Sequence, residues 1–185
     1  MNLPPDNSDL LIGIEVLKES QEILLATKKG QAIRFDEKEV RPMGRSSYGV
    51  TGIKLDKNDE VVSLEVIDKT ATILTISEKG YGKRSDINDY RKTGRAGKGV
   101  INLKVTDKTG NIVKTITAEN NDDIIVTTAK GMIIRSPAQQ LRVMGRATQG
   151  VRIVKLHDGD KVTDIVKVLE DKQVEEVLKE EGLEE

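Results

Sequence analysis

Residues 78–100 read EKGYGKRSDINDYRKTGRAGKGV, and the chain contains two further copies of this stretch. The copies are KKGQAIRFDEKEVRPMGRSSYGV at 28–50 and AKGMIIRSPAQQLRVMGRATQGV at 129–151. Each copy reads Lys-Gly, three residues, Arg, six residues, Arg, two residues, Gly-Arg, three residues and Gly-Val. Because these offsets agree without a gap in all three copies, they indicate an internal repeat of about fifty residues.

Short β-like runs lie on both sides of these turns. In the second copy the runs are residues 70–77, 81–85, 99–105 and 111–118, and the other two copies carry matching runs. Each Lys-Gly lies between two runs, as expected of a hairpin whose glycine adopts a positive φ. Four strands in each repeat predict an all-β fold, a propeller-like β-pinwheel array of four-stranded blades.

The repeats also predict where the blades begin and end. Within residues 1–169 we expect three blades, at about 18–67, 68–118 and 119–169. Residues 9–17 resemble the last run of a repeat and are expected to form an extra closing strand. Residues 170–185 are rich in glutamate and are expected to form a short acidic C-terminal tail or helix.

The composition is that of a single intracellular domain. The chain has 185 residues, with one Phe, three Tyr and no Trp, so its core must consist mainly of Ile, Leu and Val, which favour strands. It has no Cys, which excludes disulfides and thiolate metal sites. The first residues, MNLPPDNSDLL, lack a basic region and a long apolar run. We therefore expect neither a signal peptide nor a membrane span, and a cytoplasmic location.

The net charge of −1 hides an asymmetry along the chain. From His157 onward there are 11 acidic and 4 basic residues, which leaves 26 basic and 20 acidic residues before it, a balance of +6. A basic body with an acidic end is typical of a protein that binds a polyanion and is moderated by its own tail. A solvated end that keeps the protein soluble is the alternative.

Enzymatic chemistry finds little support in the sequence. His157 is the only histidine, and it lies in a polar turn without a nearby Ser or Cys nucleophile pattern. The stretch GRAGKG at 94–99 differs from a P-loop, because Gly-Lys is followed by Gly-Val and a strand. Tyr48, Tyr81 and Tyr90 have no surroundings that suggest a nucleophile. We therefore expect no catalytic residue, no metal site and no cofactor in this chain.

The repeated cations favour binding of a polyanion. They fall at the end of the second strand of each repeat and in the loop after it, and in a blade array such loops recur along one rim. A curved stripe of cations suits the phosphates of duplex DNA, and the scarcity of aromatic residues and of a recognition helix favours sequence-tolerant binding. The predicted DNA-binding residues are Lys29, Arg34, Arg41, Arg45, Lys79, Lys83, Arg84, Arg91, Lys92, Arg95, Lys98, Lys130, Arg135, Arg142 and Arg146.

Two other interpretations are open at this point. The Lys-Gly and Gly-Arg pairs can serve only to set turns, with the arginines paired to acidic neighbours such as Asp36 and Asp89. Alternatively, the array is a scaffold for protein interaction or self-association through open edge strands such as 9–17 and 161–169.

Three stretches closely resemble the C-terminal domain of the DNA gyrase A subunit. The corresponding subunit of topoisomerase IV carries a shorter, related domain. The three stretches are ATKKGQAIRFDEKEVRPMGRSSYGVTGIKL at 26–55, ISEKGYGKRSDINDYRKTGRAGKGVINLKVTDKTG at 76–110 and MGRATQGVRIVKL at 144–156. The resemblance runs from about Asp9 to Leu169. Residues 93–99 are the nearest counterpart of the family's hallmark QRRGGKG and lack its leading Gln-Arg.

The resemblance implies the last three blades of a six-bladed β-pinwheel that bends and wraps duplex DNA in support of negative supercoiling. It implies as partners the remainder of the gyrase A polypeptide and, through it, gyrase B, at a nucleoid-associated place in the cytoplasm. It further implies a non-catalytic role, because ATP, Mg and the catalytic tyrosine belong to other parts of the complex.

Overall fold

The computed structural model describes residue 3, residues 9–67 and residues 70–168. Its strands are β1 Glu22–Thr27, β2 Gln31–Asp36, β3 Val61–Ile67, β4 Thr72–Ser77, β5 Tyr81–Asp86, β6 Val100–Ile101, β7 Ile112–Ala118, β8 Asp123–Thr128, β9 Ile133–Pro137, β10 Val151–Arg152 and β11 Val162–Val168. Single-turn 3-10 helices follow the second strand of each repeat, η1 at Glu37–Glu39, η2 at Ile87–Asp89 and η3 at Ala138–Gln140. The described residues form no α-helix, and the predicted all-β fold is confirmed.

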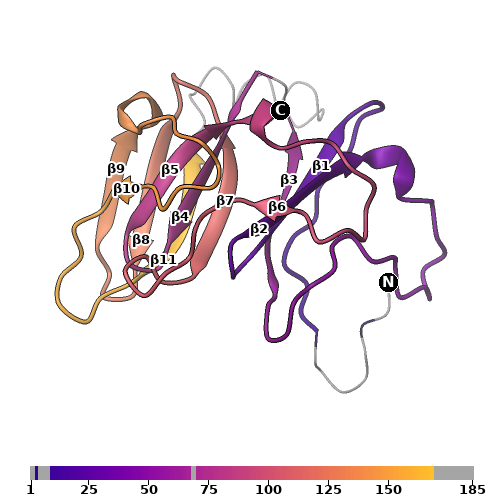
Figure 1. Ribbon diagram of the computed structural model, residues 1–185, viewed down its shortest axis with the longest axis horizontal. Coiled ribbons are helices and arrows are strands. Elements are labelled where there is room, and N and C mark those ends of the chain that lie inside the picture. Colours follow the sequence, from indigo (N-terminus) through magenta and orange to yellow (C-terminus); the bar gives the residue numbers. More distant parts are fainter. Residues whose placement is uncertain (1–2, 4–8, 68–69, 169–185) are drawn as a thin grey trace, which may run out of the picture.

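The strands form three antiparallel sheets, which are the blades of the array (Figure 1). The strand orders are β3-β1-β2-β6 in the first blade, β10-β5-β4-β7 in the second and β11-β8-β9 in the third. The second blade lies between the other two, because its strand β7 packs against both β3 and β11. The inner strands are β3, β7 and β11, and in each blade the hairpin β1–β2, β4–β5 or β8–β9 lies outside them, with β2, β5 and β9 as its outer strand.

The outermost strand of the first two blades comes from the following repeat. Ala32 of β2 pairs with Val100 of β6, and Gly82 of β5 pairs with Val151 of β10. The expectation of a strand over 99–105 inside its own blade is therefore wrong, since only two of these residues pair, and they pair with the preceding blade. The exchange depends on Gly99, whose φ is +76° and where an added Cβ would collide with the carbonyl oxygen of Ala32.

The third blade has three strands among the described residues. Its β9 holds the position that β2 and β5 hold in the other blades, but no described strand of a following repeat pairs with it. The predicted four-stranded blade is thus present twice and incomplete once in this part of the chain.

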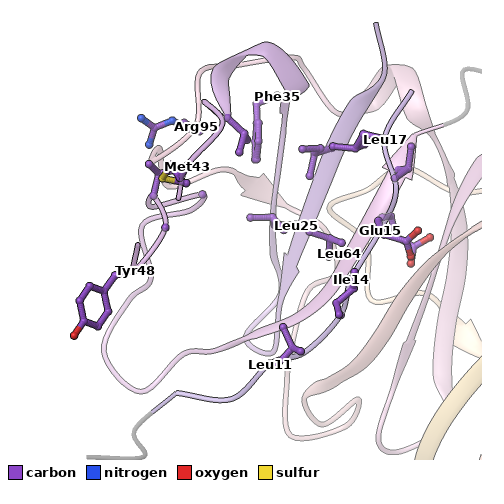
Figure 2. Close-up of a pocket in the computed structure, with 18 of the residues that line it drawn as sticks. Leu11, Ile14, Glu15, Leu17, Leu25, Phe35, Met43, Tyr48, Leu64 and Arg95 are labelled. Atoms are coloured by element: carbon purple, nitrogen blue, oxygen red, sulfur yellow. The ribbon is translucent and has the colours of Figure 1, made fainter. Parts of the chain in front are cut away.

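The expected closing strand at 9–17 does not form. The segment passes close to the first blade, with the Cβ position of Gly13 4.0 Å from Cβ of Leu64 in the edge strand β3, but its backbone forms no ladder with that strand (Figure 2). The other scaffold edge expected over 161–169 does contain a strand, because β11 pairs along one side with β8. The predicted acidic tail, 170–185, lies outside the described residues.

The core consists of apolar layers between neighbouring blades. Leu24, Ala26 and Ala32 of the first blade pack with Ile73 and Ile87 of the second. A larger layer joins the second and third blades, and its members include Leu74, Ile76, Ile116, Ile124, Val126, Val154 and Ile165. Because each blade buries one face on the next, the array is held together by burial of aliphatic side chains, as the composition predicts.

A charged side chain interrupts this pattern in the second blade. Lys83 is 1% exposed, and its Nζ donates one hydrogen bond, to Oγ of Ser85 at 2.6 Å. The equivalent residues of the other repeats are Ile33 and Ile134. Burial lowers the pKa of Lys83 from the ordinary lysine value of 10.5 to about 8, because removal from water disfavours the ammonium form.

We expect Lys83→Ile to raise the free energy of unfolding at pH 7 by roughly 3 kcal/mol, since lowering the lysine pKa from 10.5 to about 8 corresponds to a free energy of about this size. Below pH 8 the folded protein holds a buried ammonium at a cost. Between about pH 8 and 10.5 the unfolded chain binds the proton more strongly, so the wild type gains stability as the pH rises. The gain from Lys83→Ile should therefore shrink across that window in urea titrations. The exposed Lys104→Ile serves as control, and a loss of stability at every pH would contradict the expectation.

Candidate nucleic-acid interface

The loops that follow η2 and η3 cross the outer edge of the preceding blade. In the second repeat the amide of Thr93 donates to the carbonyl of Arg34 at 2.9 Å, and the carbonyl of Gly97 accepts from the amide of Lys54 at 2.9 Å. The third repeat has matching bonds, from Met144 to Arg84 at 2.8 Å and from Lys104 to Thr148 at 3.0 Å. The glycine-rich loops thus form the outer rim of the first two blades.

The first arginine of each loop is exposed, Arg91 and Arg142 on this rim and Arg41 at the equivalent position of the first repeat. Arg41, Arg91 and Arg142 are exposed, and within the described part of the chain their side chains form no hydrogen bond or ion pair. Their spacing by one repeat provides one unpaired guanidinium in each repeat. This arrangement provides a row of charge-assisted hydrogen-bond donors for a regular anionic ligand.

The arginine of each Gly-Arg pair joins two blades. Arg95 donates from Nε to the carbonyl of Glu39 and from Nη1 to that of Thr51, each at 3.0 Å. Arg146 donates in the same way to Asp89, at 2.9 Å, and to Ile101, at 3.0 Å. The equivalent Arg45 is exposed and makes no such bond to the described residues.

Two cations of the second strands, Arg34 and Arg84, act inside the protein. Arg34 donates to Oε2 of Glu22 at 2.5 Å and to the carbonyl of Ile87, in the next blade, at 2.9 Å. Burial raises the pKa of Glu22, but hydrogen bonds and charge from Arg34 and Lys92 outweigh this, so the pKa lies below its ordinary value. Arg84 is 2% exposed and donates to the carbonyl of Ala138, in the third blade, at 3.0 Å.

The third member of this series, Arg135, differs. It is exposed and pairs with Asp123 of its own blade at 2.6 Å, with no partner in another blade over the described ranges.

Three of the predicted DNA-binding residues, Lys83, Arg34 and Arg84, are not on the solvent-facing rim. Because their side chains are largely buried, we place them in the interior that supports the rim.

The remaining predicted residues are exposed but partly engaged. Lys29 and Lys130 donate from Nζ to turn carbonyls of their own blades, at 2.7 and 2.6 Å, and Lys79 makes the equivalent bond. Lys92 pairs with Asp36 at 2.6 Å, and Lys98 lies 4.0 Å from Asp56. The alternative in which cations only set turns and pair with acids thus describes some members of the repeat and not others.

A second recurring series of cations was not identified from the sequence. Lys54, Lys104 and Lys155 are exposed, and their side chains make no hydrogen bond or ion pair to residues that the structure describes. Lys54 and Lys104 bond through their amides to the loop of the following repeat, so they lie beside the rim arginines. The signal was a lysine nine residues after each Gly-Arg arginine. We call Arg41, Arg91, Arg142, Lys54, Lys104 and Lys155 the cationic stripe.

The described residues contain no group of three His, Asp or Glu side chains arranged to hold a metal ion. They contain no helix long and apolar enough to cross a membrane. His157 lies exposed in its turn, as expected from the sequence.

Comparison with known proteins identifies consistent relatives. The family described as "DNA gyrase C-terminal domain, beta-propeller" matches residues 21–68, 71–118 and 122–168, which contain the three sheets. The DNA gyrase A protein of Halalkalibacterium halodurans is 52% identical over 169 residues, covering 91% of this chain and 20% of the relative. That of Chlamydia pneumoniae is 35% identical over 174 residues, covering 94% and 21%. The chain thus spans about a fifth of the length of these relatives.

Two solved structures share the fold. The C-terminal domain of DNA topoisomerase IV superposes with a TM-score of 0.87 at 25% identity, covering 97% of this chain and 57% of that domain. The DNA gyrase A C-terminal domain gives a TM-score of 0.78 at 26% identity, covering 83% and 52%.

Proposed function

The chain belongs to the DNA gyrase C-terminal domain family, and from this premise we propose that its cationic stripe binds duplex DNA through the phosphate backbone. The observation that carries the proposal is the recurrence, in each repeat, of exposed Arg and Lys side chains that have no partner among the described residues, four of which lie at the outer rim of the first two blades. A duplex presents phosphates at regular intervals along a path that such a rim can follow.

The proposed binding is tolerant of sequence. Base readout in the major groove usually requires a helix or a β-ribbon that enters the groove, and the described residues form no α-helix. Stacking on single strands requires exposed aromatic rings, of which Tyr48 is the prominent case because Tyr81 and Tyr90 are buried. Contacts from flexible cations to phosphates explain the arrangement without base specificity.

We further propose that the rim bends the DNA that it holds. Successive contacts along a curved edge favour a curved duplex, which repays the elastic energy of bending. In the context of a full gyrase A polypeptide, such wrapping would present DNA for ATP-dependent strand passage elsewhere in the complex and so support negative supercoiling. On this proposal the chain itself is non-catalytic and needs no cofactor, acts with the rest of gyrase A and with gyrase B at the nucleoid in the cytoplasm, and its acidic end competes with DNA for the rim.

The salt dependence of binding tests the electrostatic mechanism. If the six cations of the stripe each neutralise one phosphate, the logarithm of the binding constant should fall with the logarithm of salt concentration at a slope of roughly −5. The measurement is fluorescence anisotropy of a random-sequence duplex of about forty base pairs, titrated at several salt concentrations. A slope near zero, or no binding at low salt, would contradict the proposal.

A further inference from the structure

Two exposed cations contact one aromatic ring in the second blade. Nζ of Lys108 and Cζ of Arg152 each lie 5.4 Å from the centroid of the Tyr81 ring. Tyr81 is only 9% exposed, whereas both cations are exposed to solvent. A cation at this distance is attracted by the negative face of the ring, so Tyr81 gathers two like charges at one place on the surface.

The three side chains carry hydrogen-bond donors that the described residues leave unused. Nη2 of Arg152 donates to the phenol oxygen of Tyr81 at 3.1 Å, and the hydrogen of that phenol has no acceptor in this part of the chain. The ammonium of Lys108 and the other N–H groups of Arg152 likewise form no hydrogen bond or ion pair there. Two positive charges beside a phenol O–H form a set of donors suited to an oxyanion.

The acidic residues of this corner do not neutralise the two cations. Asp107 precedes Lys108, but its backbone carbonyl accepts a hydrogen bond from Nζ of Lys79. Across the described ranges, no ion pair joins the carboxylate of Asp107 or of Glu78 to either cation on the ring. The mutual repulsion of the two cations would be relieved by a bound anion.

Tyr81 and Arg152 have no counterpart of their kind in the other blades. Arg152 pairs with Tyr81 across β10 and β5, and the equivalent pair in the first blade is Ile101 with Gln31. In the third blade the residue equivalent to Tyr81 is Met132. This cluster therefore does not recur with the repeat, whereas the cationic stripe does.

The cluster lies on the same outer edge as the rim arginines (Figure 1). β10, which carries Arg152, pairs with β5, and the carbonyl of Arg142 accepts from the amide of Arg84 in β5 at 3.2 Å. Arg142 and Arg152 thus lie opposite positions of β5 that are three residues apart, roughly 10 Å along the strand. A duplex held at Arg142 has further phosphates within this span, because each strand carries one about every 3.4 Å of helix axis.

We propose that Tyr81, Lys108 and Arg152 bind one phosphate of the duplex, and we call them the phosphate anchor. The phosphate oxygens accept from the Lys108 ammonium, from the guanidinium of Arg152 and from the hydroxyl of Tyr81. The source of this phosphate rests on the proposed function, since it belongs to the duplex on the rim. The second blade then makes one more phosphate contact than its neighbours and is the strongest point of attachment along the rim.

The first test uses inorganic phosphate and no DNA. In proton–nitrogen correlation NMR spectra at constant ionic strength, the Nε–H of Arg152 and the amides of Tyr81 and Lys108 should shift saturably with phosphate. The double variant Lys108→Gln, Arg152→Gln should lose the saturable shift, and its spectrum also shows whether it is folded. Shifts that stay linear, or that chloride reproduces, would overturn the anchor.

The second test measures duplex affinity by fluorescence anisotropy at about 0.1 M salt. The double variant Lys108→Gln, Arg152→Gln should bind about tenfold more weakly, with a salt slope smaller by about 0.9, because one phosphate loses its partners. Tyr81→Phe should bind a few-fold more weakly with an unchanged slope, since it removes one hydrogen bond and no charge.

The matched control removes two cations from the inner strands. Lys114 of β7 and Lys167 of β11 lie away from the outer rim, so changing both to Gln should leave the affinity within about twofold. Equal losses for the two double variants, or a Tyr81→Phe variant that binds as the wild type does, would overturn the anchor as a duplex contact. A wild-type chain that binds no duplex would contradict the proposed function as well, and the phosphate titration alone would then decide whether the anion site exists.

Discussion

Replacing Arg41, Arg91 and Arg142 together by Gln is expected to lower the affinity for a random-sequence duplex by on the order of a few hundredfold at about 0.1 M salt. Each neutralised phosphate contributes close to one decade of affinity there, through the release of condensed counterions. The salt slope should fall by about 2.7 for the same reason. Fluorescence anisotropy across salt concentrations measures both quantities.

A matched control separates the stripe from net charge. Lys29, Lys79 and Lys130 are also exposed and repeated, but their ammonium groups are held by turn carbonyls of their own blades. Changing these three to Gln removes the same total charge and should change affinity far less, with the salt slope nearly preserved. Equal losses for both triple variants would show that binding follows total charge and would contradict a specific role for the rim arginines.

Gly80→Ala is expected to destabilise the fold by roughly 2–5 kcal/mol. Two effects add at this position. The φ of +76° is unfavourable for an L-residue, and the new Cβ would lie 2.5 Å from the carbonyl oxygen of Val154. This oxygen is a backbone atom and cannot rotate away as a flexible side chain could. The carbonyl of Gly80 also accepts from the amides of Ile153 and Val154, so the chain cannot move away without losing these bonds. Urea denaturation monitored by circular dichroism measures the change.

Gly131→Ala isolates the packing effect from the backbone effect. Gly131 has a φ of +83° but open space around its Cβ position, so only the conformational term of about 1–2 kcal/mol should apply in dilute solution. Gly44→Ala, at a position that lacks a positive φ and has no described neighbour within 4 Å, should be nearly neutral. If Gly80→Ala and Gly131→Ala were equally destabilising, the cross-blade contact at Gly80 would contribute nothing to stability.

Much of the fold could be predicted from the repeat. The three hairpins and their Lys-Gly turns follow from local pattern, because hairpin glycines and alternating apolar residues act over a few neighbouring positions. The blade that the strand beginning at each Gly-Val would join could not be predicted, since the same residues can pair with their own blade or with the preceding one. The closing strand predicted at 9–17 does not form for a similar reason, because a strand-like composition does not determine whether the segment pairs with a neighbouring strand.

The candidate site shows the same division. The repeat indicated which arginines and lysines recur, but it treated Arg34, Arg41 and Arg45 as equivalent contributors. In the structure the copies of Arg34 at position 84 and of Arg45 at 95 and 146 bind carbonyls between blades, while the copies of Arg41 have no partner in the described part of the chain. The lysine series at 54, 104 and 155 was equally regular in the sequence, but nothing local distinguishes a rim lysine from any other exposed lysine.

The sequence by itself determined the period, the all-β class and the excess of cations in the repeated body, because these depend on composition and on spacing along the chain. Only the tertiary structure decided which cations face solvent, which blade receives the strands after Gly99 and Gly150, and which strand edges have no partner among the described residues. These are contacts between residues about fifty positions apart, and their outcome depends on which donor, acceptor and apolar face meet across two blades.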